Sequence, residues 1–106
     1  MCTHIPALEE SGFVVTLDKY IWQGVAIWLR ERLDRRLRVV PVSLNVSRVD
    51  ILACDVAEHM GALAAQYNLP PELMRIEITE TAYTGESEAV DKLTADLHTR
   101  GFSTYM

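Results

Sequence analysis

The stretch Val42-Ser43-Leu44-Asn45-Val46-Ser47 decides the fold, because apolar and polar side chains alternate along it. Such alternation is typical of a β-strand with one apolar and one polar face. A second stretch, Met74-Arg75-Ile76-Glu77-Ile78-Thr79, repeats the pattern after an intervening helical segment. Two alternating strands joined through a helix predict a βαβ unit, in which the strands run parallel.

Helical and extended segments alternate along the whole chain with short connections. An amphipathic helix is predicted from Leu17 to about Leu37, with a cap near Thr16. The elements predicted after it are a strand over Arg38–Ser47, a helix that opens at the capping box Asp55 to Glu58 and stops at Asn68, a strand over Leu73–Thr79, a helix through Val90, Leu93 and Leu97 that ends at Gly101, and a strand from Phe102. This order is typical of an α/β fold with a parallel sheet, here about three strands alternating with three helices. Since the outer strands leave unpaired backbone groups, we expect a homo-oligomer or a swapped assembly that covers these edges.

Composition narrows the possible functions. The chain has 106 residues, 49% of them apolar, so it forms one small domain or part of one. Its formal net charge of −5 argues against binding to the backbone of a DNA or RNA polymer. The two cysteines, Cys2 and Cys54, suggest neither a disulfide framework nor a zinc cluster, and no segment is typical of a signal peptide or a membrane span. We therefore expect a protein of the reducing cytoplasm.

Both predicted strands have a polar face. The polar face of the first strand consists of Ser43, Asn45 and Ser47, and that of the second consists of Arg75, Glu77 and Thr79. Parallel strands covered on both sides are usually apolar throughout, so something polar is expected against these faces. Asn45 and Glu77 would lie near the carboxyl ends of their strands, where α/β folds place their chemistry. Their amide and carboxylate oxygens suit Mg²⁺ or Mn²⁺, which could clamp a phosphodiester and activate a water molecule.

Simpler roles for these residues stay open at this point. The Asn45 amide could cap neighbouring backbone groups, and Glu77 could pair with Arg75 or another basic group on a solvent-facing sheet. Cys54 lies just before a predicted helix, a position that can lower the pKa of a thiol, but no matching histidine base accompanies it.

Around these residues the sequence resembles the EAL domain family of cyclic di-GMP phosphodiesterases. The run Ile5-Pro6-Ala7-Leu8-Glu9-Glu10-Ser11-Gly12-Phe13-Val14 is similar to the segment after the family's signature motif. Leu44-Asn45-Val46-Ser47 is similar to its asparagine-bearing strand, Leu69-Pro70-Pro71-Glu72 to its pre-strand turn, and Glu77-Ile78-Thr79-Glu80-Thr81 to its glutamate strand. These motifs come in family order over almost the whole chain.

The resemblance implies a TIM-like (β/α) barrel that hydrolyses cyclic di-GMP to the linear dinucleotide with Mg²⁺ or Mn²⁺. It implies that Asn45 and Glu77 bind the metal and that Glu80 holds a neighbouring active-site loop in place. The family's Glu-Ala-Leu signature is expected before Ile5, and its Asp-Asp-Phe-Gly segment after Met106; neither is present in the chain. Residues 1–106 are therefore expected to form an incomplete EAL-like domain, without the N-terminal signature strand and the C-terminal part of the barrel.

Two functions are consistent with these observations. The first is a fragment of a cyclic di-GMP phosphodiesterase in bacterial second-messenger signalling, inactive as an isolated chain because most carboxylates of a two-metal site are missing. The alternative is a degenerate EAL-like module that binds a ligand or another protein without catalysis.

Overall fold

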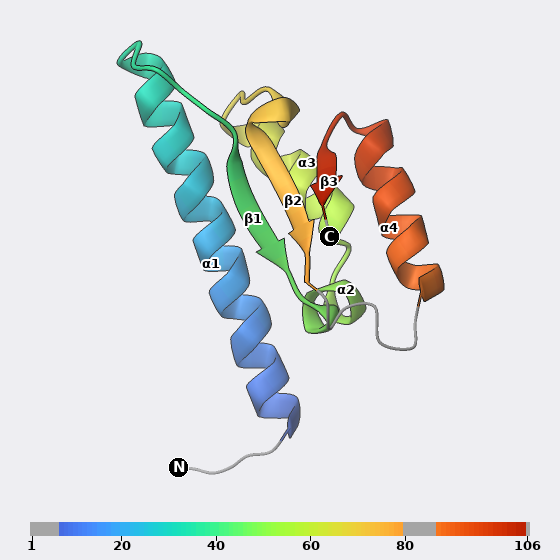
Figure 1. Ribbon diagram of the computed structural model, residues 1–106. Helices are drawn as coiled ribbons and strands as arrows, with labels where there is room; N and C mark the ends of the chain where they lie inside the picture. The colour runs from blue at the N-terminus through green and yellow to red at the C-terminus, as the bar shows by residue number, and fades with distance from the viewer. Residues whose placement is uncertain (1–6, 80–86, 106) are drawn as a thin grey trace.

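The structure, a computed structural model, describes residues 7–79 and 87–105 and confirms an α/β fold with three parallel strands. The elements in chain order are α1 (Ala7–Asp34), β1 (Val42–Val46), α2 (Arg48–Ala53), α3 (Val56–Gln66), the 3₁₀-helix η1 (Pro71–Leu73), β2 (Met74–Ile78), α4 (Ser87–Thr99) and β3 (Ser103–Tyr105). The strand order is β1-β2-β3, so helical connections join neighbouring strands. In Figure 1, α3 lies behind the sheet, with α1 and α4 on either side. This is the arrangement of successive units in the wall of a (β/α) barrel.

One face of the sheet forms the centre of the core. Leu44 and Val46 of β1 are buried on this face beside Ile76 and Ile78 of β2. The buried residues that complete the core are Trp22, Ala26, Leu29, Val56, Ala57, Met60, Leu63, Ala64, Leu69, Met74, Val90, Leu93, Leu97 and Phe102. Burial of this apolar layer is the main favourable contribution to folding. Because the helices pack against this face, the alternate strand residues point away from them.

Helix α1 is longer than the sequence pattern predicted. It begins at Ala7 rather than near Thr16. The run Ala7-Leu8-Glu9-Glu10 consists of strong helix formers, and no proline follows it before Leu17. The predicted boundary was wrong because the buried stripe of α1 does not begin at Leu17 but continues back to Val15.

Three helices end in the same way before a strand. The residues with positive φ at these ends are Arg36 at 56°, Asn68 at 52° and Gly101 at 95°. The next residue's N–H then bonds to a carbonyl within the helix: Leu37 to Arg32 at 2.9 Å, Leu69 to Ala64 at 2.8 Å and Phe102 to Leu97 at 3.0 Å. These are Schellman motifs, which satisfy the last carbonyls of a helix and redirect the chain. The predicted stops at Asn68 and Gly101 are thus confirmed as turn residues.

The first strand is shorter than predicted, and an unpredicted short helix follows it. β1 begins at Val42, directly after Pro41, which has no N–H to donate to a neighbouring strand. Ser47 is the N-cap of α2, so the prediction that it shares the polar face of the strand was wrong. The Ser47 hydroxyl accepts from the Asp50 N–H at 3.3 Å, and the Asp50 carboxylate accepts from the Ser47 N–H at 2.9 Å. This capping box starts a helix too short to show apolar periodicity.

The start of α3 agrees with the sequence. Asp55 is its N-cap, and the Asp55 carboxylate accepts a bond from the Glu58 N–H at 3.1 Å. Over residues 7–79 and 87–105, no helix combines the length and the apolar character needed to cross a membrane.

Candidate functional site

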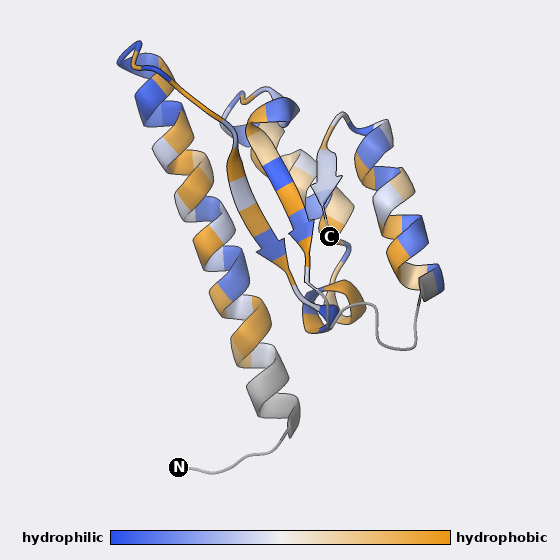
Figure 2. Ribbon diagram, in the orientation of Figure 1, coloured by the Kyte–Doolittle hydropathy of each residue, from blue (hydrophilic) through white to orange (hydrophobic). Residues whose placement is uncertain are grey.

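Asn45 and Glu77 lie directly opposite one another in the register of β1 and β2. Laterally paired residues of parallel strands point to the same side of a sheet, so both side chains lie on the face without the core. Asn45 is exposed and Glu77 is half-buried. Figure 2 shows hydrophilic and hydrophobic residues alternating along both strands. We call this side of the sheet the open face, made of Ser43, Asn45, Arg75, Glu77, Ser103 and Tyr105.

The Glu77 carboxylate has a partner that the sequence did not indicate. The Ser43 hydroxyl donates to Glu77 Oε2 at 2.8 Å, across the β1–β2 pair. This bond restrains one oxygen of the Glu77 carboxylate on the open face. In the register of the two strands Ser43 lies opposite Arg75, so its bond to Glu77 runs diagonally between β1 and β2.

The position of Asn45 is fixed through its backbone. Trp22 of α1 is buried in the core, and its indole Nε1 donates to the Asn45 carbonyl at 3.0 Å. The helix therefore anchors β1 at this residue without engaging the Asn45 amide group. Beyond the strands, the Thr79 N–H donates to the Val46 carbonyl at 3.1 Å, so pairing continues past the carboxyl ends of β1 and β2. Asn45 and Glu77 thus lie near that end of the sheet.

Asn45 and Glu77 present two hard oxygen donors side by side, which is chemically suited to Mg²⁺ or Mn²⁺. They are a partial donor set, because such ions take about six ligands. Within the described residues, no group of three or more histidine, cysteine, aspartate or glutamate side chains is placed to hold a metal ion. Glu80, predicted to support an active-site loop, lies outside the described residues.

Arg75 occupies the open face one alternate position before Glu77. It forms no ion pair with Glu77. Instead, its guanidinium lies 4.0 Å from the centre of the Tyr105 ring of β3, a cation–π contact. Its Nε atom is buried and meets no hydrogen-bond acceptor among the described residues. This stacking contact joins β2 to β3, and its arginine lies nearer the amino end of β2 than Glu77 does.

Asp50 is a buried carboxyl that the sequence did not identify. Its Oδ2 accepts bonds from the backbone N–H and the hydroxyl of Ser47 at 2.9 Å and 3.0 Å. Its Oδ1 is buried without an N–H or O–H donor among the described residues. Burial and the neighbouring Asp18 carboxyl raise the pKa of Asp50 to about 7. A protonated Asp50 can donate a hydrogen bond to Asp18, whereas an ionised Asp50 cannot.

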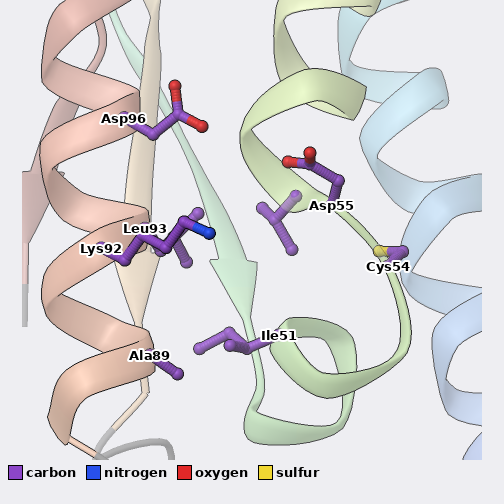
Figure 3. A pocket seen from close by; sticks show the side chains of 8 residues that line it. Ile51, Cys54, Asp55, Ala89, Lys92, Leu93 and Asp96 are labelled. Carbon is purple, nitrogen blue, oxygen red and sulfur yellow. The ribbon is translucent and has the colours of Figure 1, made fainter.

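A separate pocket of about 230 Å³ lies among the helices, lined by Ile51, Cys54, Asp55, Val56, Ala89, Lys92, Leu93 and Asp96. In Figure 3, Lys92 and Asp96 of α4 face Asp55 across it. The pKa of the Cys54 thiol is raised by burial, and Asp50 and Asp55 add to this shift. The thiol donates to the Asp50 carbonyl at 3.4 Å. A position before a helix can lower the pKa of a thiol, but here burial outweighs that effect and the contribution of Lys19.

Comparison with known proteins supports the fold. No protein-family model matches the sequence. An uncharacterized protein of Azorhizobium caulinodans is 25% identical over 104 residues, which is 94% of this chain but 14% of that protein. The PaMucR phosphodiesterase, solved as a c-di-GMP complex, superimposes on 91% of this chain with a TM-score of 0.77 and 16% identity. The FimX EAL domain of Xanthomonas citri, solved in complex with c-di-GMP, also has a TM-score of 0.77, with 14% identity over 91% of this chain.

The chain has the fold of part of an EAL domain. It covers 41% of the PaMucR chain and 38% of the FimX chain, less than half of either. In a (β/α) barrel, the sheet face that carries no helices is the inner wall. Asn45 and Glu77 lie on the face of this sheet that carries no helices.

Proposed function

We propose that this chain is part of a metal-dependent cyclic di-GMP phosphodiesterase of the EAL type, with Asn45 and Glu77 as two of its metal ligands. The observation that carries the proposal is their register: two oxygen donors lie opposite each other near the carboxyl ends of adjacent parallel strands. The same two residues belong to the motifs that resemble the family's asparagine-bearing and glutamate strands. The two solved structures of similar fold are both c-di-GMP complexes.

In the proposed site, the protein positions the ligands and sets their charge. Glu77 contributes a negative carboxylate, held by Ser43, and Asn45 contributes a neutral amide oxygen. Anchoring of the Asn45 backbone by Trp22 keeps the two donors in register. When bound, Mg²⁺ or Mn²⁺ would neutralise charge on the phosphodiester and lower the pKa of an attacking water molecule. Glu80 is proposed to support an adjacent active-site loop.

Two donors are too few for the reaction, so the remaining ligands are proposed to come from other parts of a longer protein. We accordingly propose that the isolated chain does not hydrolyse cyclic di-GMP. The second candidate function is a degenerate EAL-like module that binds a ligand or a protein without catalysis, and the presence of both Asn45 and Glu77 favours the phosphodiesterase over it. The proposed setting is the reducing cytoplasm, which agrees with the free thiol of Cys54.

The decisive experiment compares hydrolysis of cyclic di-GMP in the presence of Mn²⁺ by three proteins. They are the 106-residue chain, a longer version with its natural flanking sequence, and that longer version with Asn45→Ala and Glu77→Ala. Ser103→Ala in the longer version is the matched control, because Ser103 lies on the same open face next to Arg75 rather than beside Asn45. Direct titration with Mn²⁺ measures metal affinity independently of turnover.

Cleavage by the longer wild type and its Ser103→Ala variant, but not by the double variant or the short chain, would establish the proposal. Mn²⁺ affinity should fall at least tenfold in the double variant. Cleavage that survives both alanine substitutions would show that Asn45 and Glu77 are not essential ligands. Binding of cyclic di-GMP or a protein partner by the longer protein without any cleavage would establish the module instead.

A further inference from the structure

Three residues of the open face form one row across the sheet. The register places Glu77 of β2 opposite Asn45 of β1 on one side and opposite Tyr105 of β3 on the other. Neighbouring strands lie about 4.8 Å apart, so Tyr105 is about as close to Glu77 along this row as Asn45 is. In Figure 1, α3 lies behind the sheet, so the open face is turned toward the reader. The proposed metal ligands therefore have an aromatic residue, 40% exposed, as their neighbour on β3.

Arg75 is the one cation among the six residues of the open face, and Glu77 is the one anion. The two lie on the same strand and the same side, two residues or about 7 Å apart along the strand. Side chains of this length could form an ion pair across that distance. They do not, because Ser43 donates to the Glu77 carboxylate at 2.8 Å and the Arg75 guanidinium lies 4.0 Å from the centre of the Tyr105 ring.

The Arg75 guanidinium has hydrogen-bond donors that this chain does not use. Its side chain is half-buried, and its Nε atom is buried without an acceptor. Over residues 7–79 and 87–105, Arg75 makes no hydrogen bond and no ion pair, and its charge meets only the Tyr105 ring. A charged group that is partly removed from water is costly unless an opposite charge or acceptors replace the water. An anion from outside the described residues would supply both.

A phosphodiester is the anion that the position of Arg75 favours. The planar guanidinium offers two Nη groups that match a pair of phosphate oxygens. The cation is held against Tyr105, which belongs to the same row as Asn45 and Glu77. This row lies near the carboxyl ends of the strands, where α/β folds bind their ligands. A phosphate group that meets a metal ion at Asn45 and Glu77 would have a further oxygen to offer to Arg75.

Tyr105 acts as a positioning residue in this arrangement. A cation–π contact that excludes water can outweigh an exposed ion pair, because solvent weakens the attraction between exposed charges. By holding the guanidinium, the Tyr105 ring keeps Arg75 from neutralising Glu77. The Glu77 carboxylate is then available to a metal ion, and the Arg75 guanidinium is available to an anion.

We propose that Arg75, positioned by the Tyr105 ring, binds a non-bridging oxygen of the phosphodiester at the open face. The inference rests on the proposed phosphodiesterase function, which brings a phosphodiester to Asn45 and Glu77. It adds a cation that the protein itself supplies to the charge that a metal ion would bring. Arg75 binds and orients the phosphate in this role and transfers no proton.

Titration calorimetry with cyclic di-GMP in EDTA tests the contact without turnover. It uses the longer version with its natural flanking sequence. Arg75→Gln should weaken binding at least tenfold, because a charge-assisted hydrogen bond to phosphate is lost. Arg75→Lys should recover only part of this loss, because lysine keeps the charge but not the planar fork. Arg100→Gln is the matched control and should bind like the wild type, since Arg100 pairs with Asp96 of α4 and lies beside Gly61 of α3, on the helix side of the sheet.

Titration with Mn²⁺ separates this role from a structural one. Arg75→Gln should not lower the Mn²⁺ affinity, because it removes a positive charge near the proposed ligands, whereas general damage to the site would lower it. Tyr105→Leu should lower the Mn²⁺ affinity at least threefold, because Arg75 is then free to pair with Glu77. Adding Arg75→Gln to Tyr105→Leu should restore the affinity, and Tyr105→Phe should not show the loss, because it keeps the ring.

Three results would overturn the proposal. They are equal affinity for cyclic di-GMP in the wild type and Arg75→Gln, an equal loss in Arg100→Gln, and a longer wild type that does not bind the nucleotide. If Arg75→Gln lowers the melting temperature and leaves nucleotide affinity unchanged, Arg75 pairs with a carboxylate of the longer protein instead. A wild type that binds the nucleotide through Arg75 without hydrolysing it would support this contact and contradict the phosphodiesterase.

Discussion

Asn45 and Glu77 are opposite one another in adjacent parallel strands, and each is held by a residue that takes no part in metal coordination in the proposed site. Ser43 bonds to the Glu77 carboxylate, and Trp22 bonds to the Asn45 carbonyl. One of these supports lies on the open face and the other reaches from the core side. The two donors are therefore positioned by both faces of the sheet, and each support can be removed separately.

Replacement of Ser43 by alanine tests the support on the open face. Ser43→Ala removes the 2.8 Å bond to Glu77, and since both side chains are partly exposed we expect a cost of about 0.5–1.5 kcal/mol in the free energy of unfolding. Urea denaturation of the wild type and of Ser43→Ala measures this difference in the free energy of unfolding. In the longer protein, Mn²⁺ affinity should fall about tenfold, as for other partners of metal ligands. Ser103→Ala on the same face is the control, and an equal effect of both substitutions would show that Ser43 has no special role.

Replacement of Trp22 by phenylalanine tests the support from the core. Trp22→Phe removes the bond to Asn45 and part of a buried ring, so we expect about 1–3 kcal/mol of destabilisation in urea denaturation. Trp28→Phe is the matched control, because Trp28 is exposed and its ring has a cation–π contact with Arg32 at 4.8 Å. That substitution should cost less than about 1 kcal/mol.

The sequence predicted the fold well where one pattern controls the structure. The alternation around Leu44 and Ile76 depends only on one buried face, so the strands and their parallel direction could be predicted. The ends at Asn68 and Gly101 were also predictable, because few residues adopt positive φ easily. The same kind of turn at the end of α1 is made by Arg36, and arginine adopts positive φ less readily than asparagine or glycine. There the helix was predicted to end near Leu37, about one turn after its observed end at Asp34.

The site could be predicted only in part, for physical reasons. Alternation assigned Asn45 and Glu77 to polar faces, but only the register shows that they are opposite each other. The Ser43–Glu77 and Arg75–Tyr105 contacts depend on lateral pairing of strands 28 or more positions apart, which periodicity within one strand does not reveal. Asp50 was missed because its burial comes from packing of α2 near Asp18 of α1. No local sequence signal reports such a contact.

Asp50 should make folding stability depend on pH. Its pKa is raised to about 7 in the folded state, chiefly by burial, whereas an unfolded aspartate has its ordinary pKa near 4. The folded state therefore binds the proton more tightly, and stability falls as the pH rises from about 4 to about 7, by at most about 1.4 kcal/mol per pH unit. Urea denaturation across this range should show a slope in the wild type that Asp50→Asn removes.

Comparison of the wild type with Asp50→Asn isolates this effect from other titrating groups. Burial lowers the pKa of His59, with a contribution from Lys19, so His59 contributes stability that is lost as the pH falls and opposes the trend. This histidine is present in both proteins, and its contribution cancels in the difference. Asp18→Asn should reduce the slope without removing it, because it takes away only the neighbouring carboxyl. A wild type and an Asp50→Asn variant with the same pH dependence would contradict the assignment.

Cys54 should be a slow nucleophile in spite of its place before α3. Burial, Asp50 and Asp55 raise its pKa in the folded chain, so less thiolate is present at neutral pH than for an ordinary cysteine. In a Cys2→Ser background, the rate of alkylation by iodoacetamide should rise at a higher pH in the folded chain than in the same chain unfolded in guanidinium. Asp55→Asn should move the folded profile toward lower pH. A folded profile centred below the unfolded one would mean that the α3 N-terminus controls this thiol after all.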